Sequence, residues 1–311
     1  SLDSISFNPA SLTSLMAVAM LPNGQQDGNQ GNNAVTRLVA PGLLKGIYTI
    51  GGKDPSFSTV AIATDYISNW GILDSVIFHV RPAIYDAQLR FGQIPGSTVL
   101  KPVIFKADPQ TNQAPTISYT SRYTERNYVM LLDGTDNVQF NNVKVSAMSG
   151  ILGNAIVLRN NTSSLLFDNV EINVSSTATG NGITIESTNS AQDLIIKNSL
   201  FNGGDYAIKS AYDTTLLSVN CTLINNVFAT SKSGGVQLRN INNALIHGNS
   251  WKPSVNANQG ISIVKAIGKV KITNNVILDL KQGAAIAVHK APGSMILGTT
   301  IANNKIGRAH V

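Results

Sequence analysis

GVQLRNINNALIHGNSWKPSVNANQGISIVKAIGKVKITNNVILDL (235–280) contains one short pattern twice. Each copy begins with a β-rich run, at 235–239 and at 260–264, and continues to an Asn between apolar residues, Asn249 or Asn275. Asn and Gly, which are poor helix formers, are frequent between these marks. Short strands that recur at a fixed distance with turns between them are typical of a solenoid.

The Asn mark recurs over more than half of the chain. Its pattern is a large apolar residue, two residues, a polar residue, one residue and a second apolar residue. The seven sites are Val138/Asn141/Val143, Leu165/Asp168/Val170, Ile195/Asn198/Leu200, Leu223/Asn226/Phe228, Ile246/Asn249/Trp251, Ile272/Asn275/Ile277 and Ile301/Asn304/Ile306. Their spacings are 27, 30, 28, 23, 26 and 29, which gives a repeat of about 27 residues.

A second marker advances with the first. It consists of β-rich runs at 155–159, 182–186, 207–211, 235–239, 260–264 and 285–289, with steps of 27, 25, 28, 25 and 25 between their first large apolar residues. A β-sandwich would not repeat in this way. The sequence therefore predicts an all-β solenoid whose successive turns stack as parallel strands.

The Asn positions fit the corners of such a solenoid. A tight bend between two strands needs a residue that tolerates the left-handed backbone conformation, and Asn does so best after Gly. Rungs about 4.8 Å apart allow aligned amides to hydrogen-bond along the stack. We expect an Asn ladder at the seven marks, with the flanking apolar residues pointing inward.

Composition narrows the class of protein. The 311 residues include 43% hydrophobic and 13% charged residues and 33 Asn, which is too apolar for disorder. The net charge of +6 is not concentrated in a basic run, so no nucleic-acid partner is predicted. No apolar stretch is long enough to span a membrane. Cys221 is the single cysteine, and its strand-like context favours a buried, inert thiol.

Before the repeats, the pattern predicts one short helix that caps the first turn. Ser56 or Ser58 is suited to cap its start, an apolar stripe runs to about Asn69, and Gly71 would end it. We divide the chain into an upstream segment (1–45), a cap with the first coils (46–127), a parallel β-helix (128–305) and a tail (306–311).

These units resemble the right-handed parallel β-helix of the pectate-lyase superfold, which has three strands per coil and an Asn ladder. The segment 46–89 is similar to the entry of secreted Bacteroidetes β-helix proteins, on the match Val80-Arg81-Pro82-Ala83-Ile84-Tyr85. That resemblance implies an extracellular or cell-surface protein, part of a longer multidomain chain. The tail IGRAHV (306–311) resembles a translated sequencing adaptor, so we expect natural sequence to be missing there.

Enzymes of the superfold are matched incompletely. The entry segment also resembles pectin methylesterases, but their paired Asp motifs on the central coils have no counterpart here. The run 203–210 resembles a polygalacturonase strand that carries two adjacent aspartates, of which Asp205 alone is present. Both likenesses inform on the fold and do not transfer an activity.

Strand alternation places one row of side chains on an outward face, where glycans lie in the related superfold. The row is Val157, Thr184, Lys209, Gln237, Ser262 and Ala287, and the strand ends add Arg159, Glu186, Arg239 and His289. Arg159, Lys209 and Arg239 are suited to bind an acidic polysaccharide through its carboxylates. The alternative is a solvated edge on which Arg159 and Glu186 simply pair.

Catalysis at this face lacks a complete set of groups. Glu186 is the single acid of the row, and Asp205 lies six positions earlier in the strand frame, about 20 Å away, too far for a glycosidase pair. His289 is the best general-base candidate. The acidic stretch 133–137 is read as a turn rather than a Ca²⁺ loop. We predict no metal and no cofactor.

Three functions remain open. The first is an exported, surface-associated module that recognises a glycan or has a structural or adhesive role, without evident catalysis. The alternative is a lyase or glycoside hydrolase that acts on acidic polysaccharide at the face, with Glu186 and His289 as catalytic candidates. A purely structural spacer is the third.

Overall fold

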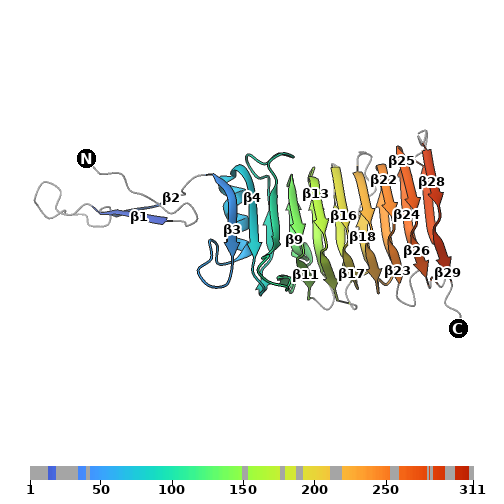
Figure 1. The fold of residues 1–311 in the computed structure, drawn as a ribbon, viewed down its shortest axis with the longest axis horizontal. Helices are drawn as coiled ribbons and strands as arrows, with labels where there is room; N and C mark the ends of the chain where they lie inside the picture. The colour runs from blue at the N-terminus through green and yellow to red at the C-terminus, as the bar shows by residue number, and fades with distance from the viewer. Residues whose placement is uncertain are drawn as a thin grey trace, which may run out of the picture.

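The computed structural model describes residues 13–18, 34–39, 43–148, 153–175, 179–186, 192–210, 219–252, 259–278, 280, 283–290 and 298–307. From residue 43 onward the described strands form three parallel sheets, which are the three sides of a rod built from stacked turns (Figure 1). Because every turn adds one strand to each sheet, the strands from β4 to β27 make eight complete turns. The prediction of a right-handed parallel β-helix is confirmed.

The first sheet holds β3 (Leu44–Ile50), β4 (Ile72–Val80), β7 (Val103–Ala107), β10 (Val138–Asn141), β13 (Ser163–Asp168), β16 (Gln192–Lys197), β19 (Val219–Ile224), β22 (Ile241–His247), β25 (Lys269–Thr273) and β28 (Gly298–Ala302). The second sheet holds β5 (Ile84–Asp86), β8 (Thr116–Tyr119), β11 (Lys144–Ala147), β14 (Glu171–Val174), β17 (Leu200–Asn202), β20 (Val227–Ala229), β23 (Ser250–Lys252), β26 (Val276–Leu278) and β29 (Lys305–Gly307). The third sheet holds β6 (Leu89–Phe91), β9 (Tyr128–Asp133), β12 (Asn154–Arg159), β15 (Ile183–Glu186), β18 (Tyr206–Ser210), β21 (Gly234–Arg239), β24 (Gln259–Ala266) and β27 (Ile286–Lys290).

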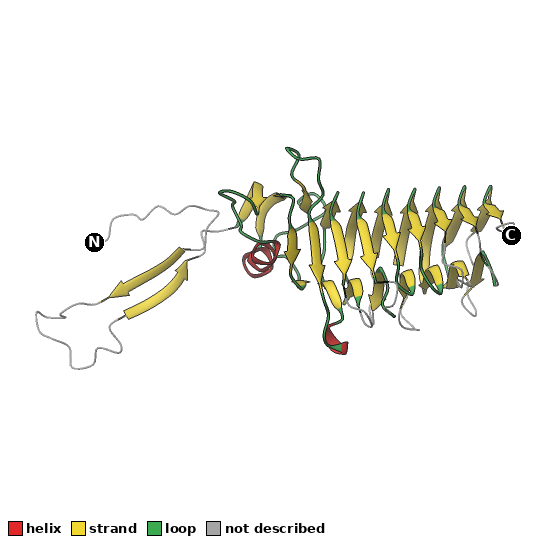
Figure 2. Ribbon diagram, turned by 90° about the horizontal axis from the view of Figure 1, so that it is seen from below, coloured by secondary structure: helices red, strands yellow, loops and turns green. Residues whose placement is uncertain are grey.

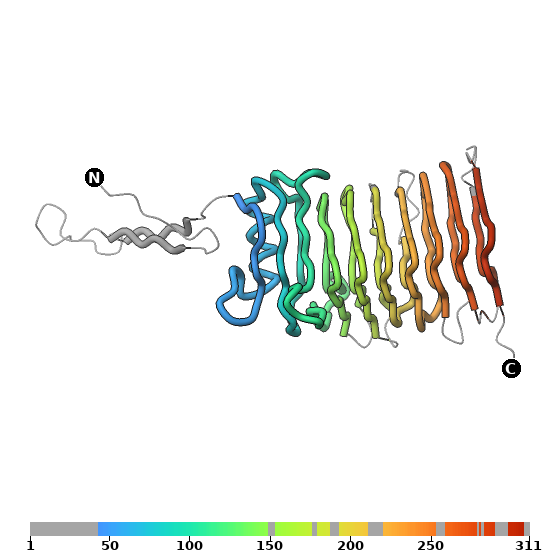
Figure 3. Tube along the Cα trace, in the orientation of Figure 1, coloured from blue at the N-terminus to red at the C-terminus, as the bar shows by residue number. Residues whose placement is uncertain are grey.

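Two further strands, β1 (Thr13–Val18) and β2 (Ala34–Val39), form an antiparallel pair of their own. A short 3₁₀ helix, η3 (Thr124–Arg126), precedes β9. Figure 3 follows the trace from turn to turn along the rod. Of the tail, residues 306 and 307 belong to β29 and residues 308–311 lie outside the described part.

The predicted helix is α1 (Val60–Trp70), which lies beside the first turns of the stack (Figure 2). Its N-cap is Thr59, whose Oγ1 accepts a hydrogen bond from the Ile62 N–H at 3.2 Å, and not Ser56 or Ser58. Ser56 instead exchanges hydrogen bonds with Thr49. The predicted stop is confirmed: Gly71 takes φ 77°, where other residues are strained.

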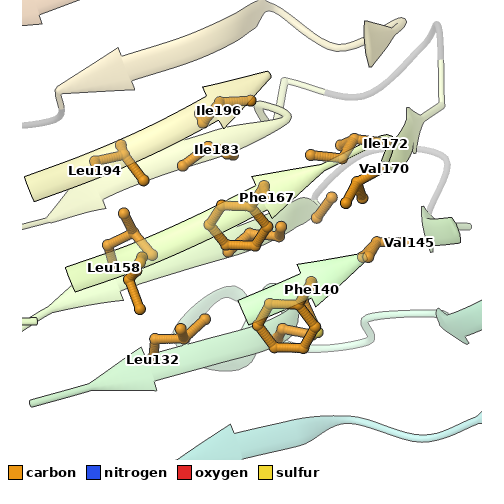
Figure 4. Packing of buried hydrophobic residues seen from close by; sticks show 14 of the residues in the cluster. Leu132, Phe140, Val145, Leu158, Phe167, Val170, Ile172, Ile183, Leu194 and Ile196 are labelled. Carbon is orange, nitrogen blue, oxygen red and sulfur yellow. The ribbon is translucent and has the colours of Figure 1, made fainter. Parts of the chain in front are cut away.

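The core is one continuous apolar column inside the rod (Figure 4). Phe78, Phe105, Phe140 and Phe167 stack from turn to turn in the first sheet, with neighbouring centroids 4.8 to 5.5 Å apart. In later turns the aromatic column moves to the second sheet, as Phe201, Phe228 and Trp251. Such stacking adds to the stabilisation that comes from burial.

The Asn ladder exists, but it includes only part of the predicted set. Asn226, Asn249, Asn275 and Asn304 are joined amide to amide at 2.9 to 3.0 Å. Each amide oxygen also accepts the backbone N–H of the preceding member. Three of the four are at most 1% exposed, so the ladder satisfies polar groups that water does not reach.

The first three predicted members are wrong. Asn141 and Asp168 are the last residues of their strands, and Asn198 occupies the corner with φ 53°. In those turns the ladder position holds Val143, Val170 and Ser199. The left-handed corner is a separate column, made of Asn142, Asn169, Asn198, Asn225, Gly248, Asn274 and Asn303. The ladder residues Asn226, Asn249, Asn275 and Asn304 follow this corner by one residue, so the expectation that they take the left-handed conformation is wrong.

The error comes from strand periodicity. A shift of two residues keeps every side chain on the same face, so the apolar pattern fits both registers. The third predicted mark is displaced by one residue instead of two, so it places Ile195 inward. Ile195 is in fact 39% exposed, and its neighbours Leu194 and Ile196 are buried. The ladder therefore depends on position within the turn, which the apolar spacing alone does not fix.

Candidate functional site

The predicted outward row is a row in the structure. Val157, Thr184, Lys209, Gln237, Ser262 and Ala287 are successive partners across β12, β15, β18, β21, β24 and β27. The strand-end residues are also in register, with Arg159 beside Glu186 and Val264 between Arg239 and His289. The 25- to 28-residue steps of the sequence therefore correspond to single rungs.

Part of the row is not open to solvent. Val157 is 1% exposed and packs with Tyr128 and Leu131 in a small apolar cluster outside the core. Thr184 and Ser262 are each 4% exposed. The accessible polar part of the face is thus narrower than strand alternation predicts.

At the strand ends, opposite charges pair along the stack. The Arg159 guanidinium lies 2.6 Å from the Glu186 carboxylate, and this hydrogen bond raises the pKa of Arg159. Two rungs earlier, Arg90 of β6 pairs with Asp133 of β9 at 2.8 Å. The alternative in which Arg159 and Glu186 pair with each other is the arrangement observed.

A column of amides borders a groove beside this pair. Asn154 donates to Asn127, and the Asn154 oxygen accepts hydrogen bonds from the Asn181 N–H at 2.9 Å and the Thr184 hydroxyl at 2.7 Å. The groove has a volume of about 270 Å³ and is lined by Asn127, Asn154, Thr179, Gly180, Asn181, Thr184, Glu186 and Lys209. Glu186 and Lys209 are the two ionisable groups of this lining.

The Lys209 ammonium is held by two neighbours. Its Nζ lies 3.4 Å from Asp205 and 4.5 Å from the centre of the Tyr206 ring. Asp205 in turn accepts a hydrogen bond from the Ser233 hydroxyl. The Asp205 N–H donates to the Gly180 carbonyl at 2.8 Å, so Asp205 lies beside the residues that precede β15. Glu186 is at the other end of β15, and the two acids are therefore far apart.

The remaining predicted site residues are spread along the rod. Gln237 is one rung from Lys209, and Arg239 and His289 are two rungs apart. Glu186 and His289 are separated by four rungs, about 19 Å at about 4.8 Å per rung. The two catalytic candidates are therefore too far apart to act on the same glycosidic bond.

The acidic stretch 133–137 is a structural turn. The Asp136 carboxylate accepts hydrogen bonds from the backbone N–H and the hydroxyl of Ser163, at 2.9 and 2.6 Å. Within the described ranges, no three His, Cys, Asp or Glu side chains gather in a way that would hold a metal ion. Among the helices of the described chain, none is long and apolar enough to cross a membrane.

Cys221 is buried and unpaired, as predicted, and burial raises the pKa of its thiol to about 12. The thiolate is the reactive form, so the folded chain at about pH 8 contains very little of it. We expect an aromatic disulfide reagent to label Cys221 about a thousandfold more slowly in native buffer than in concentrated urea. Equal rates in the two conditions would show that the thiol is accessible in the folded chain.

Sequence reasoning missed the amide column of the groove. Asn127, Asn154 and Asn181 are each 27 residues apart, which is a signal of the same kind as the ladder. They lie at or just before the first residues of strands of the third sheet, and Asn154 and Asn181 are one residue outside the β-rich runs at 155–159 and 182–186.

No family model matches the chain, and no curated protein matches it in sequence. Its structure is similar to a pectin methylesterase from Aspergillus niger, with 15% identity, 86% of each chain covered and a TM-score of 0.46. It is also similar to a rhamnogalacturonan lyase (12% identity, 85% of this chain and 62% of that chain, TM-score 0.46). A third similar structure is PfbA, a surface adhesin of Streptococcus pneumoniae (13% identity, 80% and 87%, TM-score 0.40). These are similarities of fold, and none of them assigns an activity to this chain.

Proposed function

We propose that the chain is a glycan-binding β-helix module that holds an oligosaccharide in the groove of the third sheet. The observation that carries this proposal is the groove itself, in which amides and hydroxyls from successive turns lie beside Glu186 and Lys209. Amide and hydroxyl groups are suited to bind sugar hydroxyls, and an ammonium is suited to bind a uronate carboxylate. An exported, cell-surface location goes with this proposal.

Binding without cleavage is the form of the proposal that the geometry favours. Glycosidic hydrolysis uses two carboxyl groups at most about 9.5 Å apart. Glu186 is engaged by Arg159 at 2.6 Å, and His289 lies four rungs away. A lyase or hydrolase at this face would need groups other than this pair.

The test is titration of the folded chain with trigalacturonate. We expect Lys209→Ala to weaken binding about tenfold, because it removes the ammonium at the groove. The melting temperature is expected to change little, since Lys209 is one-third exposed and its ion pair is weak. Lys144→Ala is the matched control: Lys144 pairs with Glu171 at 2.8 Å with similar exposure, on the second sheet.

Equal loss in both variants, or no binding of trigalacturonate and of neutral oligosaccharides by the wild type, would contradict the proposal. The second result would favour the spacer function. Release of unsaturated or reducing products at enzymatic rates would favour the enzyme instead. In that case Glu186→Gln tests whether Glu186 takes part: lost turnover at an unchanged melting temperature would assign it a catalytic role, and retained turnover would place the catalytic groups elsewhere.

A further inference from the structure

The net charge of +6 is divided unevenly along the rod. Residues 206–311 contain 11 of the 23 Lys and Arg but only 2 of the 17 Asp and Glu, a net charge of +9. Residues 1–205 contain the other 12 and 15, a net charge of −3. The described residues of the rod show the same difference: residues 206–307 carry 9 Lys and Arg and no acid, whereas residues 43–205 carry 11 Lys and Arg and 13 acids. Because the chain rises turn by turn along one axis, the charge differs between the two ends of the rod (Figure 3).

Four lysines in the last turns have no ion-pair partner among the residues that the structure describes. Lys252, Lys269, Lys271 and Lys305 are all exposed, and none of them forms an ion pair with a described residue. Every ion pair among the described residues lies at or before residue 209. The two acids after residue 206, Asp213 and Asp279, lie outside the described part.

These four lysines, which we call the positive pole, lie on two of the three sheets instead of lining one groove. Lys269 and Lys271 point outward from β25 in the first sheet, whereas Lys252 and Lys305 belong to β23 and β29 in the second. They fall within three successive turns, so they span about 10 Å along the axis. That is close to the Debye length of about 8 Å at physiological salt, so their fields add.

We propose that the positive pole binds an acidic polysaccharide chain that lies across the first and second sheets, apart from the groove of the third. Unpaired, exposed ammonium groups attract a polyanion and gain most where no acid competes for them. A single flexible polysaccharide strand can follow cations around a narrow rod. A rigid duplex or a bilayer would contact one side only.

The surroundings of the pole argue against the other polyanions. Single-stranded nucleic acids are held by aromatic side chains on which bases stack. Among the described residues after Tyr206, the aromatic ones are Phe228 and Trp251, and both are buried in the core. A uronate chain needs cations and solvent-exposed polar groups but no such platform.

The experiment measures binding of a long galacturonate oligomer to the full chain and to two triple variants. We expect Lys252→Gln/Lys271→Gln/Lys305→Gln to weaken binding at least about tenfold at low salt. The wild-type affinity should fall steeply between about 50 and 200 mM salt. The control Lys45→Gln/Lys53→Gln/Arg122→Gln removes the same net charge from exposed positions at the other end and should change affinity less than about twofold.

Equal loss in both triple variants would show that net charge alone matters and would overturn the pole as a site, as would no loss in either. Tighter binding of charge-matched duplex DNA, single-stranded DNA or anionic vesicles would overturn the assignment to a polysaccharide. Trigalacturonate binding and its Lys209→Ala loss report on the groove, so the two proposals can fail separately.

Discussion

Replacing Asn249 with Ala is expected to lower the free energy of unfolding by about 4 kcal/mol. The Asn249 side chain is fully buried and makes five hydrogen bonds: its oxygen accepts the backbone and side-chain N–H of Asn226, and its amide donates to Leu223, His247 and Asn275. Each buried group left without a partner costs about 1–3 kcal/mol. Urea unfolding followed by circular dichroism and by tryptophan emission, to which buried Trp251 and half-exposed Trp70 both contribute, measures the change.

The same turn supplies the control. Asn243 belongs to an outer amide column, in which it donates to Asn220 at 3.0 Å and accepts from the Lys269 N–H at 3.0 Å. Because Asn243 is exposed, water can replace both bonds, and Asn243→Ala is expected to cost less than about 1 kcal/mol. An equal cost for the two substitutions would contradict a special role for the buried ladder.

The architecture was predictable because each repeat has two markers. A single apolar pattern fits several registers, but the six β-rich runs advance by one rung each, and the last four Asn marks advance with them, which leaves one way to stack the turns. All six runs, from 155–159 to 285–289, are strands of the third sheet, and their anchor residues are rung partners. Stacking constrains every repeat in the same way, so errors in one repeat do not accumulate in the next.

The ladder and the site were predicted in part, for a physical reason. Strand alternation predicts which side chains point outward, but not whether neighbouring side chains bury them. It therefore could not predict that Tyr128 and Leu131 bury Val157. The pairing of Arg159 with Glu186 was predictable, because the two residues end neighbouring β-rich runs, and the structure contains this ion pair. The separation of Glu186 and His289 by four rungs follows from the predicted row itself, in which they end the second and the sixth β-rich run, and the strand pairing confirms it.

Packing across the rod explains a regularity in the sequence. The β-rich runs start with Ala155, Gly182, Ala207, Gly235, Gly260 and Ala285, all of them small. A Cβ built on Gly182 would lie 2.5 Å from the Ala207 carbonyl oxygen and 2.8 Å from the Phe201 ring, and one on Gly260 would lie 2.3 Å from the Ala285 carbonyl oxygen and 3.2 Å from Ile277. The small column of the third sheet therefore makes room both for the backbone of the next turn and for the large residues of the second sheet.

Gly235→Ala is accordingly expected to destabilise the chain by at least about 3 kcal/mol, although Ala is an ordinary strand residue. The added Cβ would lie 0.8 Å from Cζ2 of Trp251, and the indole cannot move away easily because it is 1% exposed and lies 4.4 Å from the Phe228 ring. Overpacking of a filled core costs about 1–3 kcal/mol and more where backbone must shift. Thermal and urea unfolding measure the loss.

Two control experiments test whether the clash with Trp251 is the cause. Gly92→Ala adds the same methyl group where no atom lies within 4 Å, and it is expected to leave stability unchanged within about 0.5 kcal/mol. Trp251→Leu alone leaves a cavity that the Gly235→Ala methyl group can partly fill. The double variant should therefore be no less stable than Trp251→Leu, so the two costs are strongly non-additive. Additive costs would mean that the added methyl group clashes with atoms other than the Trp251 indole. The size of Trp251 would then not be the reason why position 235 requires glycine.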